Sequence, residues 1–446
     1  MSVLALSLAL LSRFEPVVEW TSSKGVTGLV RTGDGTYAAS TMGGLLERKA
    51  DGVWKKQTTA DGLPSDELLA LEVRDGRLVV QTRLGAFSLN GTVWKPVAND
   101  RAVGSSSLSV DTAYGRVVAR PLLGLFAGDK PFSPGFPPEA LPILAIAGED
   151  RSMIVGTAGH GLWELSDGSW RHVDLNEPSG NSIQALAEFE GSIYASTLAD
   201  GLSRYSKGKW SLITGLSSTA PREAVTFKGA LWLRHANGAV DRFKDGKWEA
   251  GILKSVLPRK EARFLATDGK RLFVAQWGGW SVFDGDTWKH DLKRPELAGV
   301  ATTCLFPDGD RLWIGTQGKC LAVADLNSEK VEWIDERSGM TDDWVTCLAK
   351  LGEDVFVGTF VGGLVKVSRG GAKPLEMTKG ENVTCLSQFG GALLVATRSK
   401  VYSFNGYNLT VADTILPQGQ AEVQSLLSTD SGLWIGTRTG LYLAGH

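Results

Sequence analysis

A short phrase, in which an apolar strand runs into a Gly-Thr turn, recurs along the whole chain and limits the possible folds more than any other feature. The phrase begins near Tyr37, Leu78, Val117, Met153, Ile193, Leu231, Leu272, Leu312, Val355, Leu393 and Leu433. Successive copies start 36 to 43 residues apart. A period of about 40 residues indicates one supersecondary unit that the chain uses eleven times.

Each unit reads as four short strands joined by tight turns. In the copy at residues 181–210, apolar strands cover residues 183–189, 193–197 and 202–205, and a fourth begins at Trp210. Gly-containing turns separate these strands, as in an antiparallel meander. No stretch of ten or more residues shows an apolar stripe at helical spacing. Because a lone four-stranded sheet cannot cover its own apolar faces, the sequence predicts an all-β β-propeller of eleven four-stranded antiparallel blades of about 40 residues.

A tryptophan recurs at the head of the fourth strand, and its regularity indicates packing between blades and not a set of binding sites. Its copies are Trp54, Trp94, Trp170, Trp210, Trp248, Trp288 and Trp333. The last copy of the repeat lacks a fourth strand, whereas the segment from Glu15 to Trp20 has the pattern of one. We therefore predict that this N-terminal strand completes the last blade and removes two exposed sheet edges.

The predicted propeller region covers residues 15–446. Familiar propellers have four to eight blades, so eleven blades exceed one ordinary ring. We favour two rings with a junction near residues 211–221, and a single large ring or nested rings are the alternatives. The apolar run in residues 1–14 is too short to span a bilayer and predicts a signal segment, with a disordered or strand-forming N-terminus as the alternative.

Charge excludes one class of partner. The formal net charge is −2 and the pI is about 6.3, so no basic field exists to neutralise nucleic-acid phosphates. No membrane span is expected, and the predicted location is periplasmic or extracellular, with a cytoplasmic location as the alternative. The five histidines show no spacing typical of metal ligands, so neither a metal site nor a cofactor is predicted.

Two segments carry a resemblance to a known family. Residues 58–94, "TTADGLPSDELLALEVRDGRLVVQTRLGAFSLNGTVW", and residues 335–364, together with the phrases "LWIGTQG" and "LWIGTRTGLY", resemble the two-component regulator propeller repeat. The resemblance implies a ligand-sensing module outside the cytoplasm. It covers nearly the whole chain, strongly in about five copies and loosely in the others.

The turns between second and third strands, unlike the strands, differ freely in chemistry, which is how repeat folds build one asymmetric binding surface. Arginines there could bind a carboxylate or sulfate, and aromatic rings could stack on a sugar or an apolar partner. Trp344, which lies in a loop between blades, is added to the candidates from these turns. The candidate ligand-binding residues are Arg83, His160, Asp200, His235, Trp277, Lys319, Trp344, Phe360, Arg398 and Arg438.

These residues favour a non-catalytic, sensor-type propeller that binds a small molecule, a glycan or a protein on its loop face. One alternative is a propeller hydrolase or lyase that uses carboxylates or a histidine in the channel mouth on a glycan or small molecule. Another alternative is an assembly scaffold. No residue is predicted to be catalytic, because the Asp residues mostly fall in Asp-Gly turns that turn chemistry explains.

Overall fold

A computed structural model describes residues 16–49, 51–98, 102–104, 106–398, 400–412 and 422–445. The predicted signal segment, residues 1–14, lies outside the described residues. The described residues form eleven four-stranded antiparallel sheets, and β1 (Pro16–Trp20) is the fourth strand of the sheet that ends the chain. The predicted all-β propeller fold and the predicted pairing of the N-terminal strand with the last blade are confirmed. No helix among the described residues is long and apolar enough to cross a bilayer.

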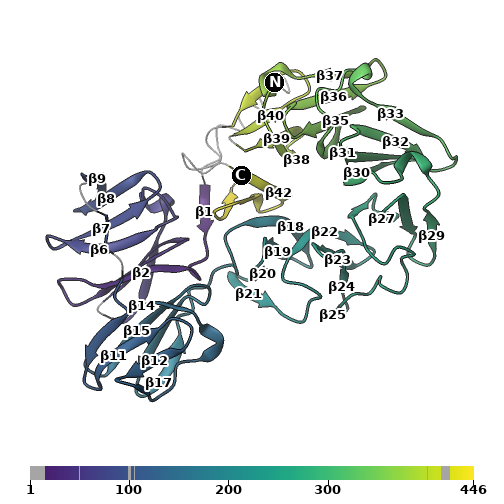
Figure 1. Cartoon of the computed structure of the whole chain (residues 1–446). Helices are drawn as coiled ribbons and strands as arrows, with labels where there is room; N and C mark the ends of the chain where they lie inside the picture. The colour runs from purple at the N-terminus through teal and green to yellow at the C-terminus, as the bar shows by residue number, and fades with distance from the viewer. Residues whose placement is uncertain are drawn as a thin grey trace. The chain divides into compact units, whose positions relative to one another are not determined.

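The chain divides into two compact units, which are described separately. Of the described residues, the larger unit contains 16–18 and those from 182 onwards, and Figure 1 shows its sheets arranged as a ring. Its first four blades are β18 (Ile183–Phe189), β19 (Ser192–Thr197), β20 (Leu202–Ser206) and β21 (Lys209–Ile213); β22 (Pro221–Phe227), β23 (Ala230–His235), β24 (Val240–Lys244) and β25 (Lys247–Glu249); β26 (Phe264–Thr267), β27 (Leu272–Gln276), β28 (Gly279–Phe283) and β29 (Trp288–Asp291); and β30 (Ala301–Asp308), β31 (Arg311–Gln317), β32 (Leu321–Asp325) and β33 (Val331–Ile334).

The other three blades of the larger unit are β34 (Val345–Leu351), β35 (Asp354–Thr359), β36 (Leu364–Ser368) and β37 (Gly371–Pro374); β38 (Val383–Phe389), β39 (Ala392–Thr397), β40 (Val401–Phe404) and β41 (Leu409–Val411); and β42 (Val423–Thr429), β43 (Gly432–Thr437) and β44 (Leu441–Ala444) with β1. Three short 3-10 helices, η3 (Pro295–Leu297), η4 (Glu336–Ser338) and η5 (Glu376–Thr378), lie in connections between blades.

The smaller unit contains residues 19–181. Its blades are β2 (Val26–Arg31), β3 (Tyr37–Thr41), β4 (Gly44–Arg48) and β5 (Trp54–Gln57); β6 (Ala70–Arg74), β7 (Arg77–Thr82), β8 (Gly85–Asn90) and β9 (Val93–Pro96); β10 (Ser109–Thr112), β11 (Gly115–Arg120), β12 (Gly124–Ala127) and β13 (Lys130–Pro131); and β14 (Ile143–Glu149), β15 (Ser152–Thr157), β16 (Leu162–Ser166) and β17 (Ser169–His172). The 3-10 helices η1 (Thr59–Asp61) and η2 (Pro138–Ala140) lie between blades.

In sequence, the smaller unit is inserted between β1 and β18 of the larger unit. One boundary falls inside β1, between Val18 and Glu19, and the other falls between Asn181 and Ser182. Residues 211–221, where the sequence analysis favoured a junction, lie inside the larger unit and run from the end of β21 to the start of β22.

The threonine of the repeated phrase closes the turn between the second and third strands of a blade. Its hydroxyl donates a hydrogen bond to a carbonyl oxygen a few residues further on, as Thr316 does to Cys320 (2.8 Å) and Thr359 does to Gly363 (2.8 Å). Both threonines are fully buried. Because this buried hydroxyl is satisfied within the turn, the scaffold holds the turn in place while the residues between can differ from blade to blade.

The glycine of the phrase leaves room for the neighbouring blade. A Cβ atom on Gly315 would stand 2.7 Å from the Cγ1 atom of Val345, which begins the inner strand of the next blade. Gly436 in β43 approaches Ile183 in the same way, since a Cβ atom there would stand 2.7 Å from the Cγ2 atom of Ile183. The blade that ends the chain therefore packs on the blade that begins at β18, and the ring of the larger unit is closed.

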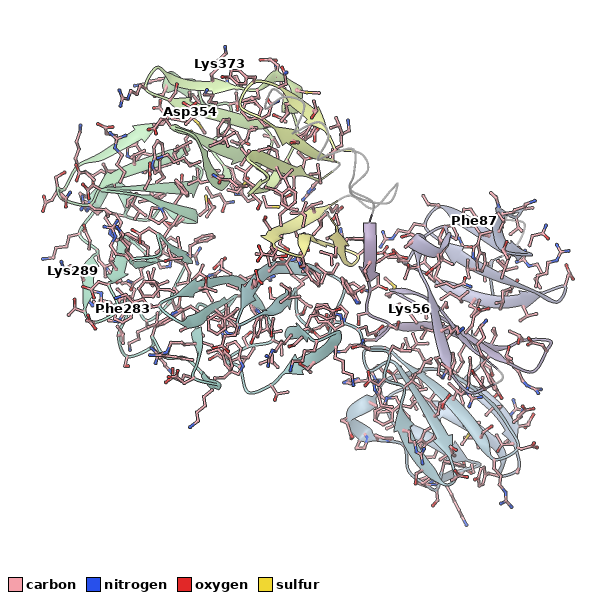
Figure 2. All side chains as sticks on the ribbon, turned by 180° about the vertical axis from the view of Figure 1, so that it is seen from behind. Lys56, Phe87, Phe283, Lys289, Asp354 and Lys373 are labelled. Carbon is pink, nitrogen blue, oxygen red and sulfur yellow. The ribbon has the colours of Figure 1, made fainter. Side chains whose placement is uncertain are left out.

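Aromatic side chains fill the space between these blades, and Figure 2 shows side chains throughout the sheets, with Phe283 labelled. The rings of Phe283 and Trp288 stack with centroids 4.8 Å apart at an interplanar angle of 13°. Trp288 also packs against the buried cluster that includes Trp232 and Leu272. The tryptophan at the head of the fourth strand is thus a packing residue here, as the repeat predicts.

In the smaller unit, the inner strands pack in the order β6, β2, β14 and β10. A Cβ atom on Gly156 of β15 would stand 2.5 Å from the Cγ1 atom of Val26 in β2, so this pair repeats the contact seen in the larger unit. The β9–β10 connection also packs inside the unit, because Val103 is buried and the Ser106 hydroxyl accepts a hydrogen bond from the Leu29 N–H (2.8 Å).

Two carboxyl groups meet near η1 in the smaller unit. Asp66 is 0% exposed and accepts hydrogen bonds from the N–H (2.7 Å) and the hydroxyl (3.1 Å) of Thr59. Glu19 accepts a hydrogen bond from the Ala60 N–H (3.2 Å) in the same loop. Burial raises the pKa of Asp66 to about 8, and the nearby Glu19 carboxylate acts in the same direction. Asp66 is therefore mostly protonated at neutral pH.

We expect Asp66→Asn to flatten the pH dependence of stability. The ordinary Asp pKa is 3.8, so between about pH 4 and about pH 8 the unfolded chain has released a proton that the folded protein keeps. The stability that comes from protonated Asp66 is present at acid pH and is lost as the pH rises towards the folded value. Asparagine does not titrate but keeps a donor and an acceptor.

Thermal unfolding of the full chain, followed from about pH 5 to about pH 8, measures this slope. Asp75→Asn is the matched control, because it removes an exposed turn carboxylate from the same unit. The control should keep the wild-type slope. If Asp66→Asn kept that slope as well, the assignment of a protonated Asp66 would be wrong.

Candidate functional site

One end of the larger unit carries the turns between second and third strands, and we call it the loop face. These turns lie on one face because every blade is an antiparallel meander that starts from an inner strand. In ring order, from the β18 blade to the β42 blade, the turns carry Asp200, Asn237, Trp277, Lys319, Phe360, Arg398 and Arg438. Trp344 reaches the same face from the connection between β33 and β34.

The loop face brings three predicted residues together from successive connections. The rings of Trp344 and Phe360 stack with centroids 4.2 Å apart at an interplanar angle of 14°. The guanidinium carbon of Arg398 lies 5.9 Å from the centroid of the Phe360 ring. We call this group the Trp344 stack. Both rings are partly exposed, so the stack forms an aromatic surface with a cation at one side.

Hydrogen bonds fix the two rings of the Trp344 stack. The Phe360 N–H donates to the Trp344 carbonyl oxygen (3.0 Å). The carboxylate of Asp342 accepts hydrogen bonds from the N–H groups of Trp344 (3.0 Å) and Val361 (2.6 Å). Asp342 therefore joins the connection between blades to the β35–β36 turn. This arrangement holds the aromatic surface in place before any ligand arrives.

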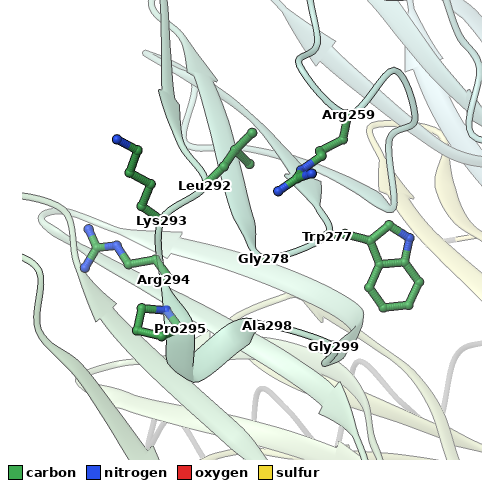
Figure 3. Close-up of a pocket in the computed structure, with 9 residues that line it drawn as sticks. All are labelled: Arg259, Trp277, Gly278, Leu292, Lys293, Arg294, Pro295, Ala298 and Gly299. Atoms are coloured by element: carbon green, nitrogen blue, oxygen red, sulfur yellow. The ribbon is translucent and has the colours of Figure 1, made fainter.

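Trp277 lies beside a pocket of about 500 Å³ on the loop face, which Figure 3 shows in close-up. Its side chain is 40% exposed, and the guanidinium carbon of Arg263 lies 4.5 Å from the centroid of its ring. The residues that line this pocket, which we call the Trp277 pocket, are Arg259, Trp277, Gly278, Leu292, Lys293, Arg294, Pro295, Ala298 and Gly299.

Glycine is required where the Trp277 turn enters β28. Gly279 has a φ of 153°, and a Cβ atom there would stand 2.0 Å from the carbonyl oxygen of Asp291. The start of β28 thus lies directly against the end of β29. This contact places Trp277 next to residues 292–299, which complete the pocket.

Three other predicted residues of the larger unit occupy the loop face without joining these two groups. Lys319 lies with its Nζ atom 5.8 Å from the centroid of the Trp333 ring. Arg438 forms an ion pair with Glu422 (3.1 Å) in which both side chains are well exposed. Asp200 is exposed, and its N–H donates to the Thr197 hydroxyl (2.8 Å). The exposed Arg438–Glu422 ion pair contributes little to stability and can open for a ligand.

Arg83 and His160 lie in the smaller unit, in turns between second and third strands. Arg83 is 70% exposed and forms an ion pair with Glu67 (3.0 Å). His160 is exposed, and its carbonyl oxygen accepts a hydrogen bond from the indole N–H of Trp163 (3.1 Å). Their assignment as ligand contacts stays a prediction.

His235 lies inside its blade, away from the surface of the loop face. Its side chain is 0% exposed, and its Nε2 atom lies 2.8 Å from Oδ2 of the equally buried Asp241. Asp241 also accepts hydrogen bonds from the Ser217 hydroxyl (2.5 Å) and from the N–H groups of Ser217 and Gly251 (both 2.8 Å). Burial opposes ionisation of Asp241, but these hydrogen bonds outweigh it and keep its pKa below the ordinary value.

The sequence analysis missed the cations around Trp277. Arg259 and Arg263 lie in the connection between β25 and β26, and Lys293 and Arg294 follow β29. The available signal was the pair of basic clusters, "PRKEAR" and "LKR", on either side of Trp277. These cations lie in connections between blades, whereas nearly all the candidate residues lie in the turns between strands two and three.

Cysteine chemistry does not contribute a site. Burial raises the pKa of Cys347 to about 12, and it raises the pKa of Cys304 and Cys385 as well, so these thiols stay protonated at neutral pH. Within the described residues, no group of three or more His, Cys, Asp or Glu side chains is arranged to hold a metal ion.

These observations define the chain as a β-propeller protein with two compact units and, on the larger unit, a loop face that carries aromatic and cationic side chains. No protein-family model matches the sequence. No curated protein matches it either.

Solved structures give the comparison. The chain is similar to PorZ, a bacterial surface component of the type-IX secretion system of Porphyromonas gingivalis, with 13% identity and a TM-score of 0.53 over 96% of this chain and 70% of that chain. It is also similar to the extracellular domain of BT4673 from B. thetaiotaomicron, described as part of a hybrid two-component system. That match has 13% identity and a TM-score of 0.50 over 94% of this chain and 69% of that chain. These similarities establish a shared propeller fold.

Proposed function

We propose that this protein is a non-catalytic, sensor-type propeller that binds a small molecule, a glycan or a protein partner on the loop face of the larger unit. The observation that carries the proposal is the Trp344 stack, in which Trp344, Phe360 and Arg398 come together from different connections. Such a preorganised aromatic surface binds a flat apolar or sugar surface with little loss of side-chain entropy.

The sensor part of the proposal draws on two likenesses. The sequence resembles the two-component regulator propeller repeat, and the fold resembles the extracellular domain of BT4673, a protein assigned to a two-component system. Both favour a location outside the cytoplasm for this chain. Neither identifies the ligand.

A binding function is favoured over a hydrolase or lyase function because the pairs of titratable side chains that could act as acid and base are buried. In the described residues, the His235–Asp241 pair is fully buried and Asp66 of the Glu19–Asp66 pair is 0% exposed. A catalytic acid or base must come within hydrogen-bond reach of its substrate. By contrast, the rings of the Trp344 stack are partly exposed, so a ligand can reach them without a change in the structure.

We expect the double variant Trp344→Ala/Phe360→Ala to bind its ligand at least about tenfold more weakly, because an aromatic contact contributes about 0.5–1.5 kcal/mol beyond its buried area. The ligand is first sought by thermal shift of the full chain against a panel of neutral and acidic oligosaccharides and peptides, since binding to the folded state raises the melting temperature. Calorimetric titration then measures the affinity of wild type and variant for each compound that raises it.

Tyr407→Ala is the matched control. Tyr407 is 86% exposed and lies in the β40–β41 turn, at the end of the blade opposite to the loop face. The control should bind like the wild type. Equal affinity of the wild type and the double variant would remove the Trp344 stack from the site.

A further inference from the structure

The Trp277 pocket has an excess of positive charge. Arg259, Lys293 and Arg294 line it, and no acidic residue is among its lining residues. Of these cations, Arg294 donates hydrogen bonds to the carboxylate of Asp291. A pocket of about 500 Å³ with this lining has a positive potential and a volume suited to a small organic ligand.

Arg294 keeps unused hydrogen-bonding capacity although it is buried. It is 5% exposed, and its guanidinium carbon lies 4.9 Å from the centroid of the Trp280 ring. Its Nε atom donates to the carboxylate of Asp291 (2.9 Å), and its Nη2 atom donates to the carbonyl oxygen of Ser328 (2.9 Å). Its Nη1 atom has no hydrogen-bond partner among the described residues. Figure 3 shows the guanidinium group of Arg294 extending away from the Trp277 ring, so Arg294 adds positive charge to the pocket wall from a buried position.

The other lining cations come from two separate connections, and Figure 3 shows Arg259 beside Trp277, whereas the side chain of Lys293 extends away from the Trp277 ring. Arg259 and Lys293 are exposed, and no described carboxylate forms an ion pair with either. Figure 3 shows the guanidinium group of Arg259 extending over the space between Leu292 and Trp277. Arg263 lies against the ring of Trp277, and its buried Nε atom also lacks a partner among the described residues.

We infer that the Trp277 pocket binds the oxyanion of an organic ligand, a carboxylate, sulfate or phosphate group, while a flat apolar part of the same ligand packs on the Trp277 ring. Guanidinium groups form paired hydrogen bonds with such oxyanions, and an exposed indole ring offers a stacking surface. This site is separate from the Trp344 stack, and the inference does not rest on the proposed function.

Simple anions test the charge requirement. The full chain is titrated with sodium sulfate, sodium phosphate or sodium acetate, with sodium chloride at equal ionic strength as the reference. We expect at least one oxyanion to raise the melting temperature above the chloride value. The anion that raises the melting temperature, sulfate, phosphate or acetate, identifies the oxyanion that the pocket prefers. If none raised it above chloride, the inference would be overturned.

Ring-bearing anions test the role of Trp277. We expect benzoate to bind about tenfold more tightly than acetate, and benzenesulfonate about tenfold more tightly than methanesulfonate, for whichever oxyanion is active. Trp277→Ala should abolish this difference while leaving the response to the simple anion. A ring preference that survived in Trp277→Ala would place the flat part of the ligand elsewhere and overturn that part of the inference.

Arg259→Ala/Lys293→Ala should lose at least about tenfold in affinity for the active anion. The matched control is Lys270→Ala/Lys289→Ala, which removes the same charge from exposed positions of the same blade outside the pocket; Figure 2 labels Lys289. The control should retain binding, and so should Trp344→Ala/Phe360→Ala. Equal losses in the pocket variant and the charge control would show a general charge effect and refute the pocket.

Discussion

Deletion of residues 1–18 is expected to destabilise the larger unit by about 3–5 kcal/mol and to make the protein associate. The deletion removes residues 16–18, the part of β1 that belongs to the larger unit, and leaves most of the β44 edge unpaired, next to the fully buried Leu441 and Tyr442. It leaves Glu19 in place beside Asp66. Denaturant unfolding measures the stability, and size-exclusion chromatography with light scattering measures the association.

A peptide with the sequence of residues 12–18 provides the control, because added in excess it supplies the deleted part of β1 from outside the chain. We expect the peptide to restore most of the lost stability of the truncated protein and to reverse its association. Unchanged stability after the deletion would show that the pairing of β1 with β44 contributes nothing to closing the ring.

Asp241→Ala is expected to cost about 3–5 kcal/mol, because it leaves buried donors without an acceptor. The carboxylate accepts hydrogen bonds from Ser217 and Gly251 and lies beside Nε2 of His235. Since the folded pKa of Asp241 is lowered, its stabilisation is present above the ordinary Asp pKa and is lost as the pH falls through the folded value. The stability difference between wild type and variant should therefore shrink in acid.

The matched control is Asp286→Ala, an exposed aspartate in the same unit, which should change stability by less than about 0.5 kcal/mol at any pH. Chemical denaturation at neutral and acid pH gives both values. If Asp241→Ala matched this control at neutral pH, the hydrogen bonds around Asp241 would not be important for stability.

The sequence was sufficient to predict the blade, the eleven repeats and the role of the N-terminal strand, because all three depend on a short local pattern. It could not locate the division between the units. The contact of Gly436 with Ile183 and that of Gly156 with Val26 decide which blades are neighbours. Both contacts join residues far apart in the chain, and every repeat offers an equivalent glycine.

The sequence supplied single candidate residues for the site but not their arrangement in space. Trp344 and Phe360 were candidates because aromatic rings in variable loops suit stacking on a ligand, yet only the fold brings them into a stack. His235 was expected on the loop face, since it lies next to a turn. The connection after β25 packs against its blade, where the Gly251 N–H donates to Asp241, the partner of His235. This segment is irregular, so no periodic sequence pattern predicts its position.

The insertion of the smaller unit between β1 and β18 has a consequence for biosynthesis. β1 is synthesised before the smaller unit and its partner strand β44 long after it, so the larger unit cannot complete its final blade until β44 has been made. All four blades of the smaller unit emerge between these two events. The smaller unit can therefore fold during synthesis, while β1 stays unpaired until β44 has been synthesised.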